Sequence, residues 1–218
     1  MPLRRARIVL AALVWSVGIA ATRPTAAATP DGSKPVTFTC PSAGLVTVAE
    51  DGAGKKRRTI WRGSDPNDPE VCLVDTPSAR RVGTPERKLF GRWKQANVVL
   101  SGSEESVFRR GVSGLLQGTS PSTAFILRSN GEQVTEQWRV VERTSLTIGG
   151  QPIQTLKIRA NYTHSRNGAQ WYCDIWFAPS LDLFVKSAPS LDYLMFGADN
   201  SDRFTWSVVR ISDKQTPE

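Results

Sequence analysis

The sequence predicts a mainly β protein, a curved antiparallel sheet built as a meander, a sandwich or a half-barrel, with one short helix. Between residues 120 and 211, large apolar side chains recur at every second position, which is the period of a strand with one buried face. Turn-forming pairs separate these runs, namely Asn130-Gly131, Gly149-Gly150 and Asn167-Gly168. Helical spacing is confined to a segment that begins near Ser103. These observations favour hairpins joined in sequence over alternating strands and helices.

The first 28 residues predict a secretory signal peptide. Three arginines precede an uncharged apolar run at 8–21, which is shorter than the roughly 20 residues of a membrane span. Cleavage near Ala21 or Ala28 is compatible with the small side chains there, and we prefer the second site because a polar stretch follows it. We therefore expect a periplasmic or secreted protein. Its mature chain, 29–218, is predicted to form a single β-rich domain with no transmembrane segment.

The N-terminal part of this domain, 29–102, is less regular than the meander at 120–211. A polar loop rich in Asp and Pro is expected at 64–70. Short strands are expected at 36–39, 45–49 and 71–75, with two more within 88–102.

A short amphipathic helix follows. Beyond Ser103, apolar residues recur at helical offsets, namely Phe108, Val112, Leu115 and Leu116. Gly111 and Gly114 interrupt this segment, and each costs about 1 kcal/mol of helix stability relative to alanine.

The meander then supplies the remaining strands. They are expected at 122–128, 133–142, 145–148, 156–162, 171–177, 183–186 and 204–208. The polar residues after Ser212 are expected to lie outside the sheet.

The mature chain has three cysteines, and an exported protein meets an oxidising compartment where disulfides form. Cys40 and Cys72 are the preferred pair because both lie in the loop-rich N-terminal part. Cys173 alternates with large apolar residues and is interpreted as a buried thiol. A Cys72–Cys173 bridge is the alternative.

A resemblance is visible between residues 107 and 188. The motifs that carry it are Leu146-Thr147-Ile148-Gly149-Gly150 and the corner Trp176-Phe177-Ala178-Pro179, which continues to Val185-Lys186. In these motifs the chain resembles a group of uncharacterised bacterial exported proteins, with Asp182 at a position where the group commonly has glycine. The resemblance implies a β-rich periplasmic domain and transfers no activity.

The candidates for catalysis are few. His164, the only histidine, is expected at a hairpin tip, where it is poorly placed for a Ser-His-acid triad. Glu136 and Asp174 are acidic residues within otherwise patterned strands, so a hydrolase with spatially paired carboxylates is one alternative function. We otherwise expect a non-catalytic protein.

Metal and cofactor sites are not predicted. Asp65, Asp68 and Glu70 lie close together and offer oxygen ligands, but they lack the alternation and terminal Glu of a calcium loop. We interpret them as solvated carboxylates.

Surface charge provides the preferred functional hypothesis. The chain has a formal net charge of +8, and residues 54–94 contain eleven Lys and Arg but five Asp and Glu. The candidate contacts are Lys55, Lys56, Arg57, Arg58 and Arg62. Because no nucleic-acid motif is present, the expected partner of this basic surface is an anionic lipid or an acidic envelope polymer.

The preferred function is therefore a binding or scaffold protein with a basic surface, and the large aromatic residues of the second half are expected to fill a core. The other alternative is a carrier, in which the curved sheet encloses an apolar ligand.

Overall fold

The computed structural model describes residues 38–76, 84–94, 100–129, 132–190 and 205–213. All of them belong to one compact unit, residues 34–218. The predicted signal peptide, the Asn130-Gly131 turn, Val36 and Phe204 lie outside the described residues.

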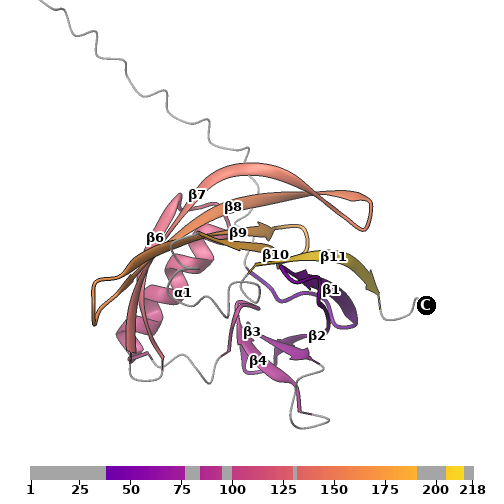
Figure 1. The fold of residues 1–218 in the computed structure, drawn as a ribbon. Helices are drawn as coiled ribbons and strands as arrows, with labels where there is room; N and C mark the ends of the chain where they lie inside the picture. Colours follow the sequence, from indigo (N-terminus) through magenta and orange to yellow (C-terminus); the bar gives the residue numbers. More distant parts are fainter. Residues whose placement is uncertain (1–37, 77–83, 95–99, 130–131, 191–204, 214–218) are drawn as a thin grey trace, which may run out of the picture. The chain divides into compact units, whose positions relative to one another are not determined.

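A single antiparallel sheet of eleven strands dominates this unit, and one helix accompanies it (Figure 1), which confirms the predicted fold class. The spatial order of the strands is β5-β4-β3-β2-β1-β11-β10-β9-β8-β7-β6. The elements are β1 (Leu45–Asp51), β2 (Lys56–Asp65), β3 (Asp68–Asp75), β4 (Glu86–Leu89), β5 (Trp93–Lys94), α1 (Gly102–Leu116), β6 (Ser122–Ser129), β7 (Glu132–Ile148), β8 (Gln151–His164), β9 (Gln170–Ala178), β10 (Leu183–Pro189) and β11 (Trp206–Asp213).

Two meanders make up this sheet. β1 to β5 run outward to one edge, α1 follows, and β6 to β11 run back from the other edge until β11 pairs with β1. The sheet is curved and unclosed, and α1 lies on its concave side (Figure 1). The curvature is strong enough that the ring of Trp93, in edge strand β5, stacks 5.1 Å from the ring of Trp138 in β7.

The long hairpin of β7 and β8 shows where the sequence pattern succeeded and where it was wrong. Gly149 and Gly150 have positive φ angles of 58° and 82°, as a tight two-residue hairpin turn requires. The two strands predicted at 133–142 and 145–148 are one continuous strand. The register with β8 shifts between Val140 and Glu142, so the period-two pattern changes phase there and suggests a break.

The N-terminal strands depart further from the prediction. Strand β2 was missed because its first half consists of cations rather than apolar residues. The loop predicted at 64–70 is shorter, since β2 continues to Asp65 and β3 begins at Asp68. Phe38 and Thr39 were predicted within a strand but lie in irregular backbone, and the Phe38 ring packs 5.1 Å from that of Phe90.

The helix forms as predicted. The Glu104 carboxylate accepts hydrogen bonds from the Ser101 N–H and hydroxyl and so caps the first turn. The buried residues of α1 are the four that the spacing predicted, Phe108, Val112, Leu115 and Leu116. The Phe108 ring packs 4.8 Å from that of Phe125 in β6, which fixes the helix against the edge of the sheet.

The structure confirms the preferred cysteine pairing. Cys40 and Cys72 form a disulfide, and Cys173 is a buried free thiol. The alternative bridge between Cys72 and Cys173 is therefore wrong in this structure.

The corner after β9 keeps the geometry that glycine would favour. Asp182 has a φ of 49°, which lies in the left-handed region that aspartate tolerates better than most residues. Its carboxylate accepts a 2.6 Å hydrogen bond from the Thr39 hydroxyl.

Candidate functional site

The concave face of the sheet contains a groove of about 710 Å³. This volume lies within the range of small-molecule sites, which are mostly apolar with a few polar groups. Six aromatic residues line the groove, namely Trp61, Trp93, Tyr162, Trp171, Phe184 and Trp206. They come from both meanders, so the groove exists only because the sheet curves.

The aromatic residues divide into two groups, which corrects the expectation that they all fill a core. Trp138 and Trp176 are buried, with 1% and 8% of their surface exposed. Trp93, Trp171 and Trp206 are half-buried and present part of their surface to the groove. The carrier alternative, in which the curved sheet encloses a cavity, therefore gains support that the sequence did not provide.

Glu136 is one of two acids that line the groove, and it is the buried one. Its side chain shares a face of β7 with Trp138, whose Nε1 donates a 2.8 Å hydrogen bond to Glu136 Oε2. Glu136 is only 5% exposed, and burial raises its pKa to about 7. The positive charge of Arg92 and the hydrogen bond from Trp138 limit that rise.

Arg92 is the cation nearest to this acid. It lies in the turn between β4 and β5, and its guanidinium stands 5.6–5.7 Å from the ring centroids of Trp93, Trp138 and Phe184. Its only direct polar contact among the described residues is a long hydrogen bond of 3.5 Å to the Tyr162 hydroxyl. Burial raises the pKa of Tyr162, so that phenol remains protonated in the physiological range.

Cys173 also lines the groove. Its sulfur lies 3.2 Å from the Ser187 Oγ, and burial raises the pKa of the thiol. Apolar surroundings of this kind make a thiol a poor nucleophile. The arrangement agrees with the interpretation of Cys173 as a structural residue.

Asp174 lies on the opposite face from Glu136. In the register, Glu136 pairs with Tyr162, whereas Asp174 pairs with Arg159, and these two partners point to different faces of β8. Arg159 holds the Asp174 carboxylate through two hydrogen bonds of 2.8 and 2.9 Å. The two carboxylates therefore share no cleft, and the hydrolase alternative loses the pair on which it depended.

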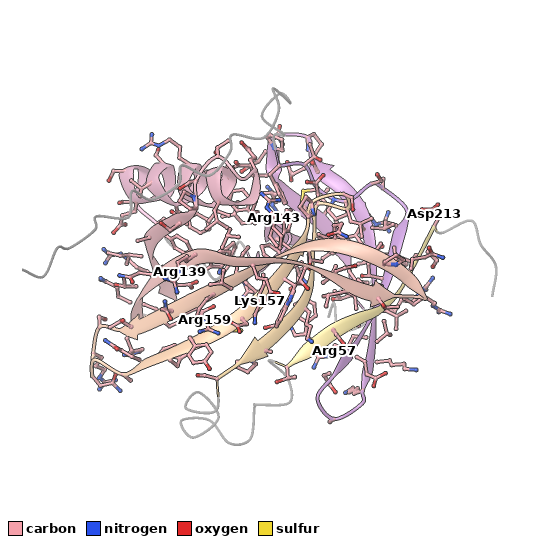
Figure 2. All side chains as sticks on the ribbon, turned by 90° about the horizontal axis from the view of Figure 1, so that it is seen from above. Arg57, Arg139, Arg143, Lys157, Arg159 and Asp213 are labelled. Carbon is pink, nitrogen blue, oxygen red and sulfur yellow. A yellow bond between two sulfur atoms is a disulfide. The ribbon has the colours of Figure 1, made fainter. Side chains whose placement is uncertain are left out.

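Two cations of β8, Lys157 and Arg159, lie near each other on the outer face of the sheet (Figure 2), and both contact Asp174. Lys157 lies 3.3 Å from the Asp174 carboxylate, and the hydrogen bonds from Arg159 and Lys157 outweigh burial and lower the pKa of Asp174. Arg159 also stands 4.5 Å from the ring centroid of Tyr172. Only 9% of Asp174 is exposed, so this part of the outer face is not simply solvated.

The predicted basic residues do not form one patch, because the pleat of β2 separates them. Arg57 lines the groove, whereas Lys56, Arg58 and Arg62 project from the other face, and Lys55 precedes the strand in the hairpin turn. Three of the five lie near acidic residues: the pairs are Lys56–Glu50 at 3.9 Å, Arg57–Asp51 at 3.9 Å and Arg62–Asp75 at 2.6 Å. The Lys56–Glu50 pair is long and exposed, and such surface pairs contribute little to stability.

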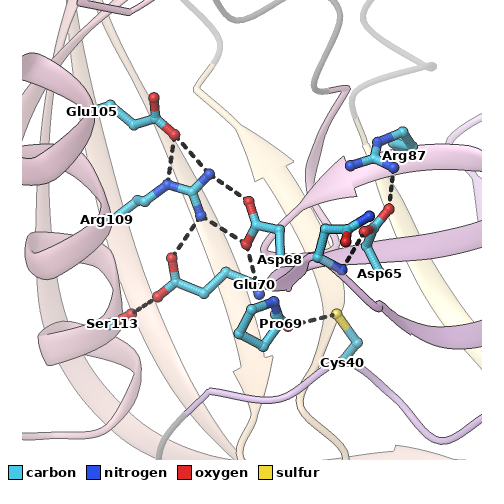
Figure 3. Close-up of polar contacts among 10 residues, drawn as sticks. Cys40, Asp65, Asp68, Pro69, Glu70, Arg87, Glu105, Arg109 and Ser113 are labelled. Atoms are coloured by element: carbon cyan, nitrogen blue, oxygen red, sulfur yellow. Dashed lines mark hydrogen bonds and ion pairs between the residues drawn. The ribbon is translucent and has the colours of Figure 1, made fainter. Parts of the chain in front are cut away.

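The acidic residues at 65–70 bind arginines rather than solvent alone (Figure 3). Asp65 is buried and pairs with Arg87, while Arg109 of α1 binds both Asp68 and Glu70. Their interpretation as solvated carboxylates is corrected accordingly. In the described part of the chain, no group of three His, Cys, Asp or Glu side chains is arranged to hold a metal ion.

His164 is the last residue of β8, where it pairs with Val134 and is half-buried, so it lies at the base of the hairpin turn rather than at the exposed tip that the sequence predicted. Its Nδ1 accepts a 3.3 Å hydrogen bond from the Arg166 N–H, so the ring helps to order the turn.

Sequence reasoning counted Arg92 among the surface cations of residues 54–94 and did not foresee that it is half-buried in an aromatic groove. The available signal was its place between Gly91 and Trp93, where a charged residue interrupts a short aromatic segment. A pattern of that length cannot reveal that β7 and β10 supply the other rings around it.

The fold and the groove define a class of protein, an open curved β-sheet with an aromatic groove on its concave face. No protein-family model matches the chain, and no curated protein matches it. Among solved structures, the chain is similar to the hypothetical lipoprotein YmcC from Escherichia coli K12. The two are 10% identical, the match covers 71% of this chain and 81% of that one, and the TM-score is 0.42.

Helices in the described ranges are all too short or too polar to cross a membrane.

Proposed function

We propose that this protein is a non-catalytic binding protein that holds the apolar part of an amphipathic molecule in the concave groove. The observation that carries the proposal is the set of half-buried tryptophans at the groove, Trp93, Trp171 and Trp206. A side chain of this size that is left partly uncovered in a concavity provides a large apolar contact area for a ligand.

The charged residues of the groove suggest where the polar group of the ligand would bind. Three cations line it, Arg57, Lys88 and Arg92, together with two acids, Asp51 and Glu136. An aromatic groove with this mixture suits a molecule that has both an apolar body and a polar group. The Cys40–Cys72 disulfide supports an oxidising compartment, which is consistent with a periplasmic or secreted site of action.

Fluorescence titration tests this function. N-phenyl-1-naphthylamine, a neutral apolar probe, is expected to gain fluorescence on binding to the protein, and a decyl-chain competitor is expected to displace it. Ala49→Trp places a ring in the groove and should abolish probe binding. Val48→Trp is the matched control, because Val48 is the neighbouring residue on the opposite face of β1. Equal binding by both variants would refute the groove as the site.

Lys55 to Arg58, in the hairpin between β1 and β2, support a second proposal, which is contact with an anionic lipid or envelope polymer. Lys55 and Arg58 are exposed and have no ion-pair partner among the described residues. Charge reversal of both, together with Lys56 and Arg57, is expected to abolish salt-sensitive binding to vesicles of anionic phospholipid. Vesicle binding that survives this change would exclude the hairpin as the contact.

A further inference from the structure

The groove contains a cation that no carboxylate neutralises. Two other arginines in this structure bind carboxylates directly. Arg159 binds Asp174 with two hydrogen bonds, and Arg109 binds Asp68 and Glu70. Within the part of the chain that the structure describes, Arg92 forms no ion pair. Burial lowers the pKa of Arg92, but interactions with Tyr162, Cys173 and Glu136 outweigh it, so the pKa is raised although Glu136 forms no ion pair with the guanidinium.

The guanidinium of Arg92 is held in position by rings. Trp93, Trp138 and Phe184 surround it at 5.6–5.7 Å, and the preceding Gly91 has a φ of 67°, which only glycine adopts readily. An alanine at Gly91 would also place its Cβ 3.3 Å from the Trp61 ring. The turn therefore presents Arg92 to the groove in a fixed orientation.

Most of the donors of Arg92 are available. A guanidinium has five N–H groups, and a single long hydrogen bond of 3.5 Å to Tyr162 uses one of them. No fully buried side-chain nitrogen among the described residues lacks a partner, so the other N–H groups of Arg92 are reached from the groove that it lines. A planar array of donors at a concave surface matches the oxygen atoms of a carboxylate or a phosphate.

We infer that Arg92 binds the anionic head group of the ligand, a carboxylate or a phosphate monoester, while the surrounding aromatic rings hold its apolar chain. This inference rests on the proposed function and specifies the class of ligand. Head-group binding supplies the anion that Arg92 lacks within the protein. The half-buried rings of Trp93 and Trp171 then contact the chain beyond the head group.

Four decyl probes test the inference on the unmodified protein: decanoate, decyl phosphate, decanol and decyltrimethylammonium. Each is used below its aggregation concentration, and binding is measured by displacement of N-phenyl-1-naphthylamine. At least one of the two anions is expected to bind 10-fold or more tightly than decanol, and the cation more weakly than decanol. The stronger of the two anions identifies the head group as a carboxylate or a phosphate.

Variants then assign the effect to Arg92. Arg92→Met keeps an unbranched apolar stem but removes the guanidinium, and it should weaken binding of the preferred anion by about 10- to 100-fold while decanol binding stays the same. Arg139→Met is the matched control, because Arg139 is exposed on the other face of β7 and does not line the groove. Arg92→Lys retains the charge without the planar donors, and an intermediate loss is expected.

The outcomes separate the inference from the function that it extends. If decanol binds as tightly as both anions, the head-group inference is wrong, whereas the proposed groove function stands. If no decyl probe binds and the neutral probe is not bound either, the proposed function fails first. Should Arg92→Met prove unfolded by circular dichroism, the four-probe comparison on the unmodified protein still decides.

Discussion

The indole Nε1 of Trp138 lies 2.8 Å from Oε2 of Glu136, two residues earlier on the same face of β7. Trp138 is almost fully buried, whereas the Glu136 carboxylate reaches the edge of the groove. The hydrogen bond therefore fixes a titratable group at the boundary between the core and the candidate site. Burial raises the pKa of Glu136 to about 7, and the bond limits that rise because it favours the ionised carboxylate.

Replacement of Trp138 tests this relationship. Trp138→Phe keeps an aromatic ring but removes the donor, so the pKa of Glu136 is expected to rise above about 7. The variant should also lose about 1–3 kcal/mol of unfolding free energy, because it leaves a small cavity and an unpaired carboxylate. A carbon NMR titration of the glutamate carboxyls measures the first effect. Trp176 is also buried but lies on the other face of the sheet from Glu136, so Trp176→Phe should leave the Glu136 titration unaltered.

Glu136 makes stability depend on pH in a specific direction. Burial raises its pKa from an ordinary value of 4.5 to about 7 in the folded protein, so the folded state binds this proton more tightly than the unfolded state. The resulting stabilisation is fully present below pH 4.5 and is lost as pH rises toward 7. It amounts to roughly 3 kcal/mol.

Glu136→Gln removes this contribution, because glutamine does not titrate. Urea unfolding at pH 4.5 and pH 7.5 should show that the variant loses less stability than the unmodified protein as pH rises. The neighbouring charges do not confuse the comparison, since Arg92 stays ionised and the pKa values of Tyr162 and Cys173 are raised. Glu142→Gln, on the exposed face of β7, is the control. Parallel pH profiles for Glu136→Gln and the unmodified protein would contradict the assignment.

The sequence predicts the features of the fold that depend on neighbouring residues better than those that depend on contacts between distant segments. Strand patterning and the Gly149-Gly150 turn are local, and they identified the meander and the turn of its longest hairpin, although the strand before that turn was divided in two. The β2 strand was missed because its cations carry no apolar alternation; its pairing with β1 and β3 determines it instead. The groove also depends on long-range contacts, because Trp93 and Trp171 come to line one cavity only through the curvature of the sheet.

The disulfide offers a direct test of the N-terminal packing. Non-reduced peptide mapping should recover one linked pair, Cys40 with Cys72, and a free Cys173. The bridge closes a loop of sequence separation 32, so its reduction is expected to lower the unfolding free energy by about 3–4 kcal/mol. Cys173→Ala should leave the effect of the reductant unchanged, and a linked Cys173 peptide would overturn the pairing.

Arg109 fastens α1 to β3, which suggests a test of how the helix is held. Its guanidinium binds Asp68 at 2.8 Å and Glu70 at 2.9 Å, and Glu105 on the same helix lies 2.7 Å away. Burial lowers the pKa of Arg109, but these hydrogen bonds outweigh it and the pKa is raised.

Arg109→Met would leave these carboxylates facing one another without a cation. We expect a loss of about 2–3 kcal/mol in urea unfolding, partly restored by high salt, which screens the repulsion. Arg110→Met changes the adjacent exposed arginine and should cost less than about 0.5 kcal/mol. Equal effects of the two substitutions would show that Arg109 contributes no more than a surface charge.

Gly111 shows why a residue that weakens a helix is nevertheless present in it. A Cβ at this position would overlap the Thr123 hydroxyl of β6 and approach the Thr123 Cβ to 3.1 Å, so the helix and the strand are too close for a side chain. Gly111→Ala gains about 1 kcal/mol of helix propensity, but the overlap should reverse the sign and destabilise the protein by about 1–2 kcal/mol. Thr123→Ala in the same chain should recover most of that loss. Gly102→Ala meets no atom within 4 Å and should not destabilise, so a stabilising Gly111→Ala would show that the close approach is wrong.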